Sequence, residues 1–324
     1  MAISELSLFL PFAASQIYHR WFPSAKLSCV QKLYSQIETD RDIFENLLVD
    51  SDPLVWEDFI YCCIEYGGDS FNWLKELSYW HSDVVLKLSN AIHHHMVGVR
   101  LAGATTVSIL SDFYPIKLRQ ISKPPLILTC LGDFRKLSTT CISVVGSRQA
   151  SWVASQYSFH IGKIAADLGW GVVSGGALGC DIAAHQGMLA SSQRDIHAVV
   201  ILAGGLYHLY PKRNSAIFNQ LIERGGVIVS ERLWSQIAIP RDFPIRNRIV
   251  SGMSSAVIVT QAAEKSGSLI TADEALEQGR DVYCFDNKES DVRFLGSQRL
   301  IEDGATRFFS PEELFIKYLI PTLT

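Results

Sequence analysis

The sequence predicts an α/β protein with a Rossmann-like, mostly parallel sheet covered by helices on both faces, preceded by a small helical domain. Short runs of β-branched residues recur from residue 142 onward, and each run ends on glycine or a small polar residue. Stretches with helical spacing separate these runs, a pattern typical of βαβ crossovers. The chain has 324 residues, which favours about two domains.

Residues 1–109 are expected to form the helical domain. Apolar residues recur at helical spacing in Trp56, Ile60 and Ile64, and Pro53 separates two short helices. The apolar stretch near the start has no preceding Lys or Arg, so we expect a buried helix there rather than a signal peptide.

Three consecutive histidines, His93–His95, raise the possibility of a metal site. Successive helical residues are rotated by about 100°, so three in a row cannot converge on one ion. We therefore expect no metal, and we place these histidines at the exposed end of a helix.

Residues 110–310 are expected to hold the Rossmann-like domain, and residues 311–324 a C-terminal helix. The expected strands cover 126–130, 142–145, 171–174, 197–202, 226–230, 256–260 and 281–285. The expected helices cover 151–168, 181–190, 268–278 and 311–319.

Composition excludes several classes of protein. No apolar run approaches the ~20 residues that a membrane span needs, so no membrane association is expected. The seven cysteines include no Cys-x-x-Cys pair, which argues against a zinc knuckle or a disulfide framework. A reducing cytoplasm is the expected location.

Charge is unevenly distributed along the chain, whose net charge is −4. Residues 205–250 hold 7 Lys and Arg against 3 Asp and Glu. A local basic stretch on a mildly acidic protein favours a partner that carries phosphates, although arginines on a solvated surface would give the same count.

Glycine-rich turns follow several of the expected strands and are the candidate phosphate sites. Free N–H groups at helix starts, helped by the helix dipole, bind anions, and nearby cations can join them. For one turn alone, a purely conformational role of glycine is the better interpretation; for the whole set, phosphate binding is. The candidates are Gly146, Ser147, Arg148, Ser174, Gly175, Gly176, Gly204, Gly205, Lys212, Arg213, Asn214, Arg246, Asn247, Arg248, Lys265, Ser266, Gly267 and Ser268.

Standard catalytic motifs are missing from the sequence. There is no Walker-type loop, no Gly-x-Gly-x-x-Gly after the first strand and no Gly-x-Ser-x-Gly, and no cofactor is expected. Asp181 and His185 share one helical face, but we favour a helix-start role for Asp181 and an internal hydrogen bond for His185. Cys180 is expected to be a buried structural thiol rather than an activated one.

Two stretches mix aromatic residues, amides and cations: residues 209–214 and 243–249. Cations can follow the phosphates of single-stranded nucleic acid while rings stack on its bases. The alternative is that Tyr210 and Phe243 pack in the core and that the arginines pair with Glu231 or Asp242.

Taken together, these motifs resemble the DNA-processing protein A (DprA/Smf) family. The matching stretches are Val145-Gly-Ser-Arg148, Ser174-Gly-Gly-Ala-Leu-Gly-Cys-Asp181, Tyr210-Pro-Lys-Arg-Asn214, Phe243-Pro-Ile-Arg-Asn-Arg-Ile249 and Lys265-Ser-Gly-Ser268, in the family's order. The resemblance covers about residues 112–305.

The resemblance implies a non-enzymatic mediator that binds single-stranded DNA and helps to load the recombinase RecA during natural transformation. It also implies a homodimer and a basic DNA pocket at the carboxyl edge of the sheet. In that family Arg148, Lys212, Arg246 and Arg248 match positions expected to hold phosphates.

A different function class stays open at this point. The same layout, with Glu264 before Ser-Gly-Ser, is similar to the lysine-decarboxylase-like (LOG) nucleotide phosphoribohydrolases, and a nucleotide-binding sensor would also fit. The Pro-Gly-Gly-x-Gly-Thr of those enzymes is absent here.

Overall fold

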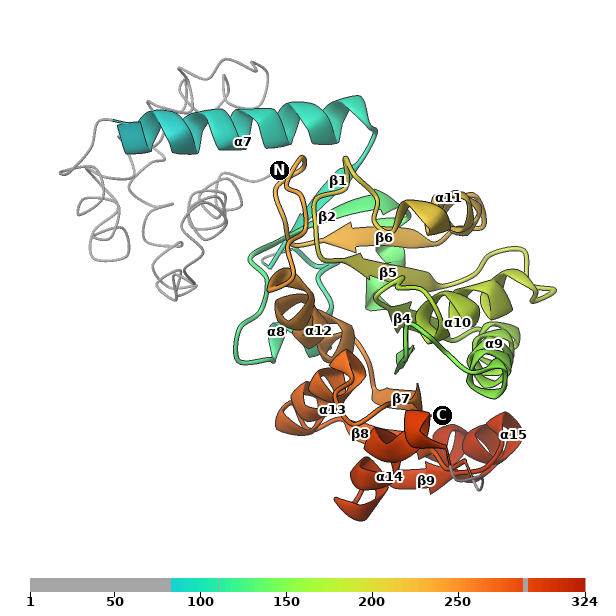
Figure 1. Cartoon of the computed structure of the whole chain (residues 1–324). Helices are drawn as coiled ribbons and strands as arrows, with labels where there is room; N and C mark the ends of the chain where they lie inside the picture. Colours follow the sequence, from blue (N-terminus) through green and yellow to red (C-terminus); the bar gives the residue numbers. More distant parts are fainter. Residues whose placement is uncertain (1–82, 110, 288–290, 324) are drawn as a thin grey trace.

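The structure is a computed structural model and describes residues 83–109, 111–287 and 291–323. Its strands, in chain order, are β1 (Thr105–Ser108), β2 (Ile127–Gly132), β3 (Cys141–Gly146), β4 (Gly171–Ser174), β5 (Ala198–Leu202), β6 (Val227–Ser230), β7 (Ala256–Gln261), β8 (Asp281–Phe285) and β9 (Thr306–Phe308). They form one sheet in the order β1-β2-β6-β5-β4-β3-β7-β8-β9 (Figure 1). The strands from β6 to β9 in that order run parallel, while β1 and β2 join antiparallel at one edge. The predicted mostly parallel sheet is confirmed.

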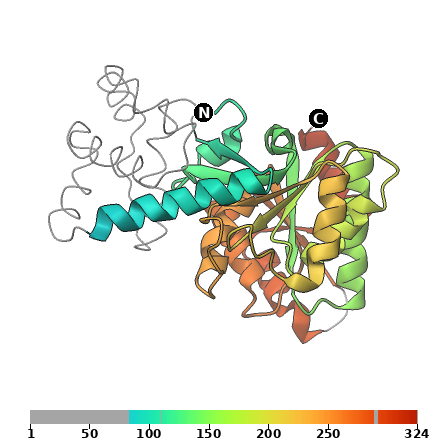
Figure 2. The same cartoon turned by 90° about the horizontal axis from the view of Figure 1, so that it is seen from above.

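Helices cover both faces of this sheet (Figure 2). The longer ones are α7 (Asp83–Leu101), α9 (Trp152–Asp167), α10 (Cys180–Leu189), α11 (Ser215–Glu223), α12 (Asp242–Gly252), α13 (Gly267–Glu277) and α14 (Leu295–Glu302). Short turns of helix are α8 (Ile116–Arg119), η2 (Phe134–Ser138), η3 (Lys212–Asn214), η4 (Val292–Phe294), α15 (Pro311–Glu313), η5 (Leu314–Leu319, a π-helix) and α16 (Ile320–Leu323).

Alternate strand residues supply two apolar cores, one on each face of the sheet. On one face, Val200 and Ile228 pack with buried residues of α9, α10 and α11. On the other face, Val199 and Val229 pack with buried residues of α12 and α13. Every residue of β5 is buried, as expected for a parallel strand covered on both sides.

Helices α9 and α10 approach each other closely because small residues line their contact. A Cβ atom on Gly162 would lie 1.9 Å from the Ala184 carbonyl oxygen, and one on Gly187 would lie 1.8 Å from that of Phe159. Only glycine fits at these two crossing points. The close packing fixes the start of α10 beside the end of β3, where the candidate site lies.

Two features differ from the sequence-based expectations. The sheet begins at Thr105, before the boundary that we placed at residue 110, because β1 pairs with β2. The expected exposed position of His93–His95 is wrong for His95, since α7 continues to Leu101 and His95 is 1 % exposed. Its Nδ1 accepts the N–H of Trp234 at 3.0 Å. The expectations on residues 1–82 lie outside the described residues.

The order of the strands creates a switch point between β3 and β7. From β3 the chain moves outward through β4, β5 and β6, and then returns through α12 to place β7 on the other side of β3. In open α/β sheets the connections leave the sheet in opposite directions at such a point, which opens a crevice at the carboxyl edge. The fold therefore predicts a ligand site after Gly146 and Gln261, which are register partners.

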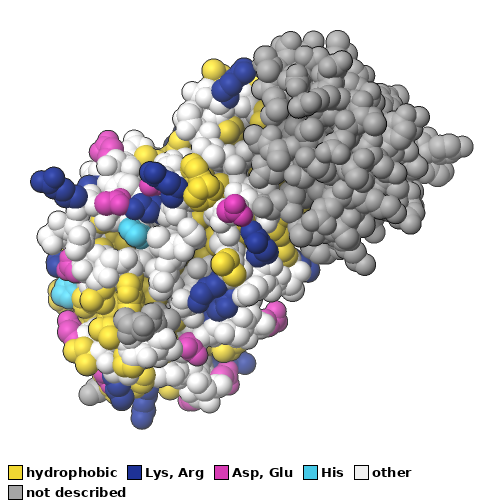
Figure 3. Space-filling view, turned by 180° about the vertical axis from the view of Figure 1, so that it is seen from behind, with side chains coloured by type: hydrophobic (Ala, Val, Ile, Leu, Met, Phe, Trp, Pro, Cys, Tyr) yellow, Lys and Arg dark blue, Asp and Glu magenta, His cyan; other side chains and the backbone are white. Residues whose placement is uncertain are grey.

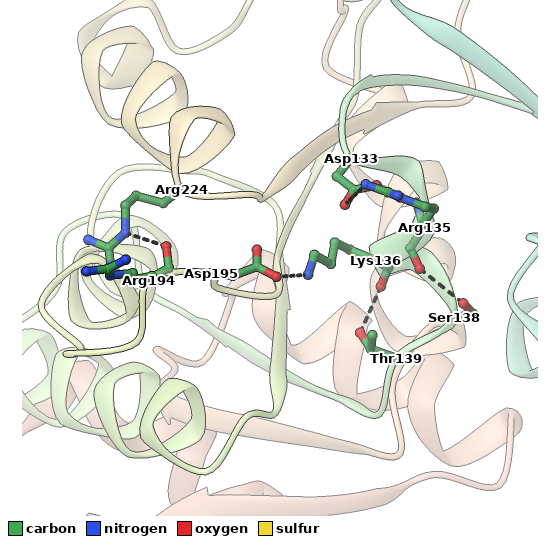
Figure 4. Close-up of polar contacts among 8 residues, drawn as sticks. All are labelled: Asp133, Arg135, Lys136, Ser138, Thr139, Arg194, Asp195 and Arg224. Carbon is green, nitrogen blue, oxygen red and sulfur yellow. Dashed lines mark hydrogen bonds and ion pairs between the residues drawn. The ribbon is translucent and has the colours of Figure 1, made fainter.

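The opposite, amino edge of the sheet is closed by internal polar contacts (Figure 4). The buried Lys136 forms an ion pair with Asp195, and Arg135 binds Asp133 through Nε at 2.7 Å. Arg224 donates to backbone carbonyls of the preceding loop, including that of Arg194 at 3.2 Å. Most of the cations shown at this amino edge therefore bind carboxylates or backbone carbonyls of the protein itself.

The face of the described part seen in Figure 3 carries no continuous field of one charge, because Lys and Arg side chains there are interspersed with Asp and Glu. Among the described residues, no helix combines the length and the apolar character needed to cross a bilayer.

Candidate nucleic-acid interface

A hollow of about 400 Å³ lies at the predicted switch point. The turn after β3, the start of α12 and the turn between β7 and α13 line it. A smaller hollow of about 60 Å³ adjoins it and shares Arg148, Ala177, Phe243 and Arg246 with it. We call the two together the groove; its polar and aromatic lining comprises Ser147, Arg148, Gln149, Asp181, Tyr210, Phe243, Arg246, Asn247, Lys265, Ser266, Ser268 and Thr271.

A cation and two rings form a row along the groove. The guanidinium carbon of Arg148 lies 4.8 Å from the centroid of the Phe243 ring, which is a cation–π contact. The Phe243 ring meets the Tyr210 ring edge to face, with centroids 6.0 Å apart. Arg148 is exposed and Tyr210 is 53 % exposed, so both present a flat polar or aromatic surface to a ligand. The alternative that Tyr210 packs in the core is wrong.

Arg246 lines the groove from below and is only 8 % exposed. Its Nη1 donates to the Gly175 carbonyl at 2.9 Å and also to the Ile201 carbonyl. Burial lowers the pKa of this guanidinium to about 10, an effect that the nearby Asp181 carboxylate opposes. The group still carries its charge at neutral pH, and it supplies a fixed positive potential under the groove.

Arg248 points away from the groove. Residues two apart on a helix are rotated by about 200°, so Arg246 and Arg248 occupy opposite sides of α12. Arg248 is buried and forms an ion pair with Glu231, as the alternative interpretation of residues 243–249 predicted. Arg248 does not line either hollow, so the structure separates it from the other candidate phosphate ligands.

The turn after β4 supports Arg246 rather than opening directly to a ligand. A Cβ on Gly175 would lie 2.5 Å from Nη2 of Arg246, so a side chain at this position would displace the guanidinium. The Gly175 N–H donates to Asp181 at 3.1 Å, and the Asn214 side chain donates to the Gly176 carbonyl at 2.9 Å. Of this turn's candidates, Gly175 lines the smaller hollow, while Ser174 and Gly176 lie behind it, with Ser174 fully buried.

Gly204 and Gly205 serve the fold in the same way. The Gly205 N–H donates to the Gln236 carbonyl at 2.7 Å, and the Gly204 carbonyl accepts the Ser230 hydroxyl at 2.7 Å. Both glycines are buried and neither lines the groove. Their N–H groups are therefore not arranged for a phosphate, because the loop after β6 covers them.

The remaining candidates lie at the rims. Lys212 and Arg213, on η3, are exposed just beyond Pro211, which lines the smaller hollow. On the other rim, Lys265 is exposed and the Ser266 hydroxyl caps α13 by accepting the Ser268 N–H at 3.3 Å. The positive end of α13 thus faces the larger hollow.

Asn247 connects α12 to the start of α13. Its amide donates to the Gly267 carbonyl at 3.3 Å, and its oxygen accepts Nε of Arg246 at 3.2 Å. Both Asn247 and Gly267 line the larger hollow. The amide therefore holds two walls of the groove at a fixed separation.

The fold separates the possible acid/base pair of Asp181 and His185, because only Asp181 lines the groove. Asp181 lines the groove, but burial raises its carboxyl pKa and its oxygen accepts the N–H groups of Gly175 and Ala177. His185 is fully buried, and neither of its ring nitrogens has a hydrogen-bond partner in the described part of the chain. The hydrogen bond that we expected for His185 is therefore wrong. Burial also raises the pKa of the Cys180 thiol to about 11.

Glu264, which the hydrolase alternative uses, is exposed and does not line either hollow. In the described part of the chain, no group of three or more His, Cys, Asp or Glu side chains is placed to hold a metal ion. The groups that face the groove thus include the cations of Arg148, Arg246 and Lys265, as well as rings, hydroxyls, amides and the Asp181 carboxylate. Cations and rings together suit binding of a phosphate-bearing chain.

A mostly parallel sheet whose switch-point groove presents an exposed arginine, two rings in edge-to-face contact and a helix start is typical of α/β proteins that bind phosphate-bearing ligands at the carboxyl edge of the sheet. Comparison with known proteins identifies the family within this class of α/β proteins. The chain belongs to the DNA recombination-mediator protein A family, whose sequence model matches residues 105–319.

Relatives support this assignment. DNA processing protein DprA of Bacillus subtilis is 37% identical over 221 residues, which cover 68% of this chain and 73% of the relative. Protein Smf of Escherichia coli is 36% identical over 204 residues, 63% of this chain and 54% of that protein.

Solved structures agree with the fold. DNA processing protein A from Helicobacter pylori, solved in a study of its single-stranded DNA binding mode, has a TM-score of 0.59 at 29% identity and covers 68% of this chain and 96% of its own. DNA processing protein A from Streptococcus pneumoniae has a TM-score of 0.67 at 24% identity over 97% of both chains and supports the fold alone.

Proposed function

We propose that this protein binds single-stranded DNA in the groove and acts as a recombination mediator. The observation that carries the proposal is the row formed by Arg148, Phe243 and Tyr210. Unpaired bases can stack on the rings and the guanidinium plane, and the backbone phosphates can lie against the groove's cations. Bases paired in a duplex are stacked on one another and cannot use such a row.

The phosphate contacts that we propose come from three places. Arg148 reaches the strand directly, Arg246 contributes its charge from below, and the start of α13 with Lys265 completes the opposite wall. Lys212 and Arg213 are placed to hold phosphates that leave the groove at its other end. Arg248, Gly204 and Gly205 support the fold and take no part in the proposed contacts.

The family resemblance adds the biological setting as part of the same proposal. The protein would deliver bound single strands to the recombinase RecA during natural transformation, and it would act as a homodimer without catalysing a reaction of its own. The membership of the recombination-mediator family and the single-stranded DNA study of the Helicobacter pylori relative support this role.

The first experiment compares labelled single-stranded and duplex oligonucleotides of one sequence by fluorescence anisotropy at several salt concentrations. We expect the single strand to bind more tightly at each salt concentration, because only unpaired bases can reach the rings. Equal affinity for both forms would contradict the proposal. In parallel, incubation with nucleoside monophosphates or NAD tests the hydrolase alternative, and release of free base would support it.

A further inference from the structure

A second aromatic pair stands in solvent on the turn that leads from β5 to η3. The Tyr207 side chain is 63% exposed, and its ring packs edge to face on the exposed His208, with centroids 4.6 Å apart. A lone exposed ring is common on protein surfaces and needs no explanation. The position and surroundings of this pair distinguish it from a lone exposed ring.

The turn that carries the pair is anchored at both ends. The Tyr207 N–H donates to the Trp234 carbonyl at 3.0 Å, and Leu206 beside it is buried. At the far end, the Asn214 side chain donates to the Gly176 carbonyl at 2.9 Å. The two rings are therefore presented from a fixed backbone, which reduces the entropy lost when a ligand stacks on them.

The pair lies close along the chain to the row of the groove. Tyr210 lies on the same turn, at most about 10 Å of extended chain from Tyr207, and its ring already contacts that of Phe243. At 3.4 Å per nucleotide of stacked strand, this separation corresponds to about three nucleotides. A DNA strand that leaves Arg148 and Phe243 and passes Tyr210 can thus reach Tyr207 within a few nucleotides.

The charge of the turn suits the same ligand. Residues 203–214 contain no Asp or Glu, while Lys212 and Arg213 lie exposed on η3 at its end. Rings interleaved with cations, without carboxylates, match the bases and phosphates of a single strand. A protein partner would find no acidic side chain here to pair with its own cations.

We propose that Tyr207 and His208 form a second stacking platform for single-stranded nucleic acid beside the groove, with Lys212 and Arg213, at the end of the same turn, holding phosphates of the same strand. This inference rests on the proposed function of the groove and extends its footprint along the sheet edge. It makes affinity depend on the length of the strand, because a short oligonucleotide fills the groove without reaching Tyr207.

The test uses the full chain and oligothymidylates of increasing length at constant salt. Tyr207→Ala should bind the shortest oligonucleotides like the unsubstituted protein and bind the longer ones about tenfold more weakly. Tyr207→Phe should restore the affinity, because it keeps the ring. The slope of log affinity against log salt should not change in Tyr207→Ala, whereas Lys212→Ala should flatten it by about 0.7.

Phe113 provides a matched control. It is 44% exposed and packs edge to face on Phe134 at 5.1 Å, away from the groove. Phe113→Ala should bind oligonucleotides of every length like the unsubstituted protein.

Three outcomes overturn the proposal in distinguishable ways. If Tyr207→Ala binds every length normally while Arg148→Ala weakens all of them, the groove stands and the second platform is wrong. If neither substitution changes binding, or the unsubstituted protein binds no single strand, the proposed function itself fails. Loss of a protein partner by Tyr207→Ala, with normal DNA binding, would assign this turn to protein docking and would also overturn the proposal.

Discussion

Two arginines of one groove have different tasks because their surroundings differ. Arg148 is exposed and its guanidinium lies over the Phe243 ring, so it remains available to a phosphate. Arg246 is buried and donates to two backbone carbonyls, those of Gly175 and Ile201. The first residue is placed to bind the ligand, and the second holds the β4 and β5 ends together while lending its charge.

This division predicts opposite effects of equivalent substitutions. Arg246→Met should lower the free energy of unfolding by about 3 kcal/mol, because it leaves buried carbonyls and the Asp181 carboxylate without their cationic partner. Arg148→Met should change it by less than about 0.5 kcal/mol and act on DNA binding instead. Denaturant unfolding of both variants measures the difference. An Arg246→Met variant as stable as the unsubstituted protein would show that the buried guanidinium does not support the fold.

From the sequence, Arg246 and Arg248 were both predicted to be phosphate ligands, because nothing in the local pattern distinguishes them. Both follow an aromatic residue in a stretch rich in cations, with no apolar helical period, since α12 buries polar residues as well as apolar ones. Only the observed helix shows that they face opposite sides. Phe243 and Tyr210 were recognised as possible stacking residues, but their contact with Arg148 depends on long-range packing.

At the scale of elements, the turns after β3 and β4 are built against each other. Gly179 has a φ of +81°, and a Cβ on it would lie 2.1 Å from the Ser147 carbonyl oxygen. The start of α10 thus supports the backbone that carries Arg148. Such a contact explains why a glycine stands at the start of this helix, where Ser or Asp is common.

Gly179→Ala should therefore damage both the fold and the site. We expect a loss of about 3 kcal/mol or more in unfolding free energy, from the left-handed backbone and the clash together, and weaker oligonucleotide binding. Gly169→Ala is the control, because Gly169 has a φ of +74° with nothing within 4 Å of the added Cβ. It should cost only about 1–2 kcal/mol and leave binding unchanged. Equal losses in the two variants would refute the contact.

Helix α7 is attached to the loop after β6 through His95. Burial lowers the pKa of this imidazole to about 4, and the neutral ring accepts the Trp234 N–H. A histidine whose pKa is depressed in the folded state contributes stability above its unfolded pKa of about 6.5, and loses it as the pH falls toward 4. A protonated His95 would no longer accept that N–H at Nδ1.

The stability difference between the unsubstituted protein and His95→Gln should consequently depend on pH. At neutral pH the unsubstituted protein should be the more stable of the two. The gap should then shrink by about 1.4 kcal/mol per pH unit between about pH 6.5 and about pH 4. Unfolding titrations at several pH values give this difference directly, and other groups cancel in it. A gap that stays constant with pH would mean that His95 titrates normally.

At the scale of the whole molecule, the sequence predicted a strand best where the residue pattern along the strand matches its burial in the folded protein. The parallel strands β4 and β8 were predicted to the residue because glycine or polar residues bound their short apolar runs. The edge strands β1 and β9 were missed, since four and three residues carry no readable period. The switch point follows from strand order, which no local pattern specifies, and it is what brings residues 147–149 and 265–271 to one groove.

The central claim is that Arg148 binds a phosphate of single-stranded DNA, and the salt dependence of binding tests it most directly. We expect Arg148→Ala to weaken binding across sequences and to reduce the slope of log affinity against log salt by about 0.7, the value for one phosphate contact on a single strand. Arg194→Ala, which removes an exposed cation at the opposite edge of the sheet, should leave both unchanged. If Arg148→Ala retains both the affinity and the slope of the unsubstituted protein, the groove is not the DNA site.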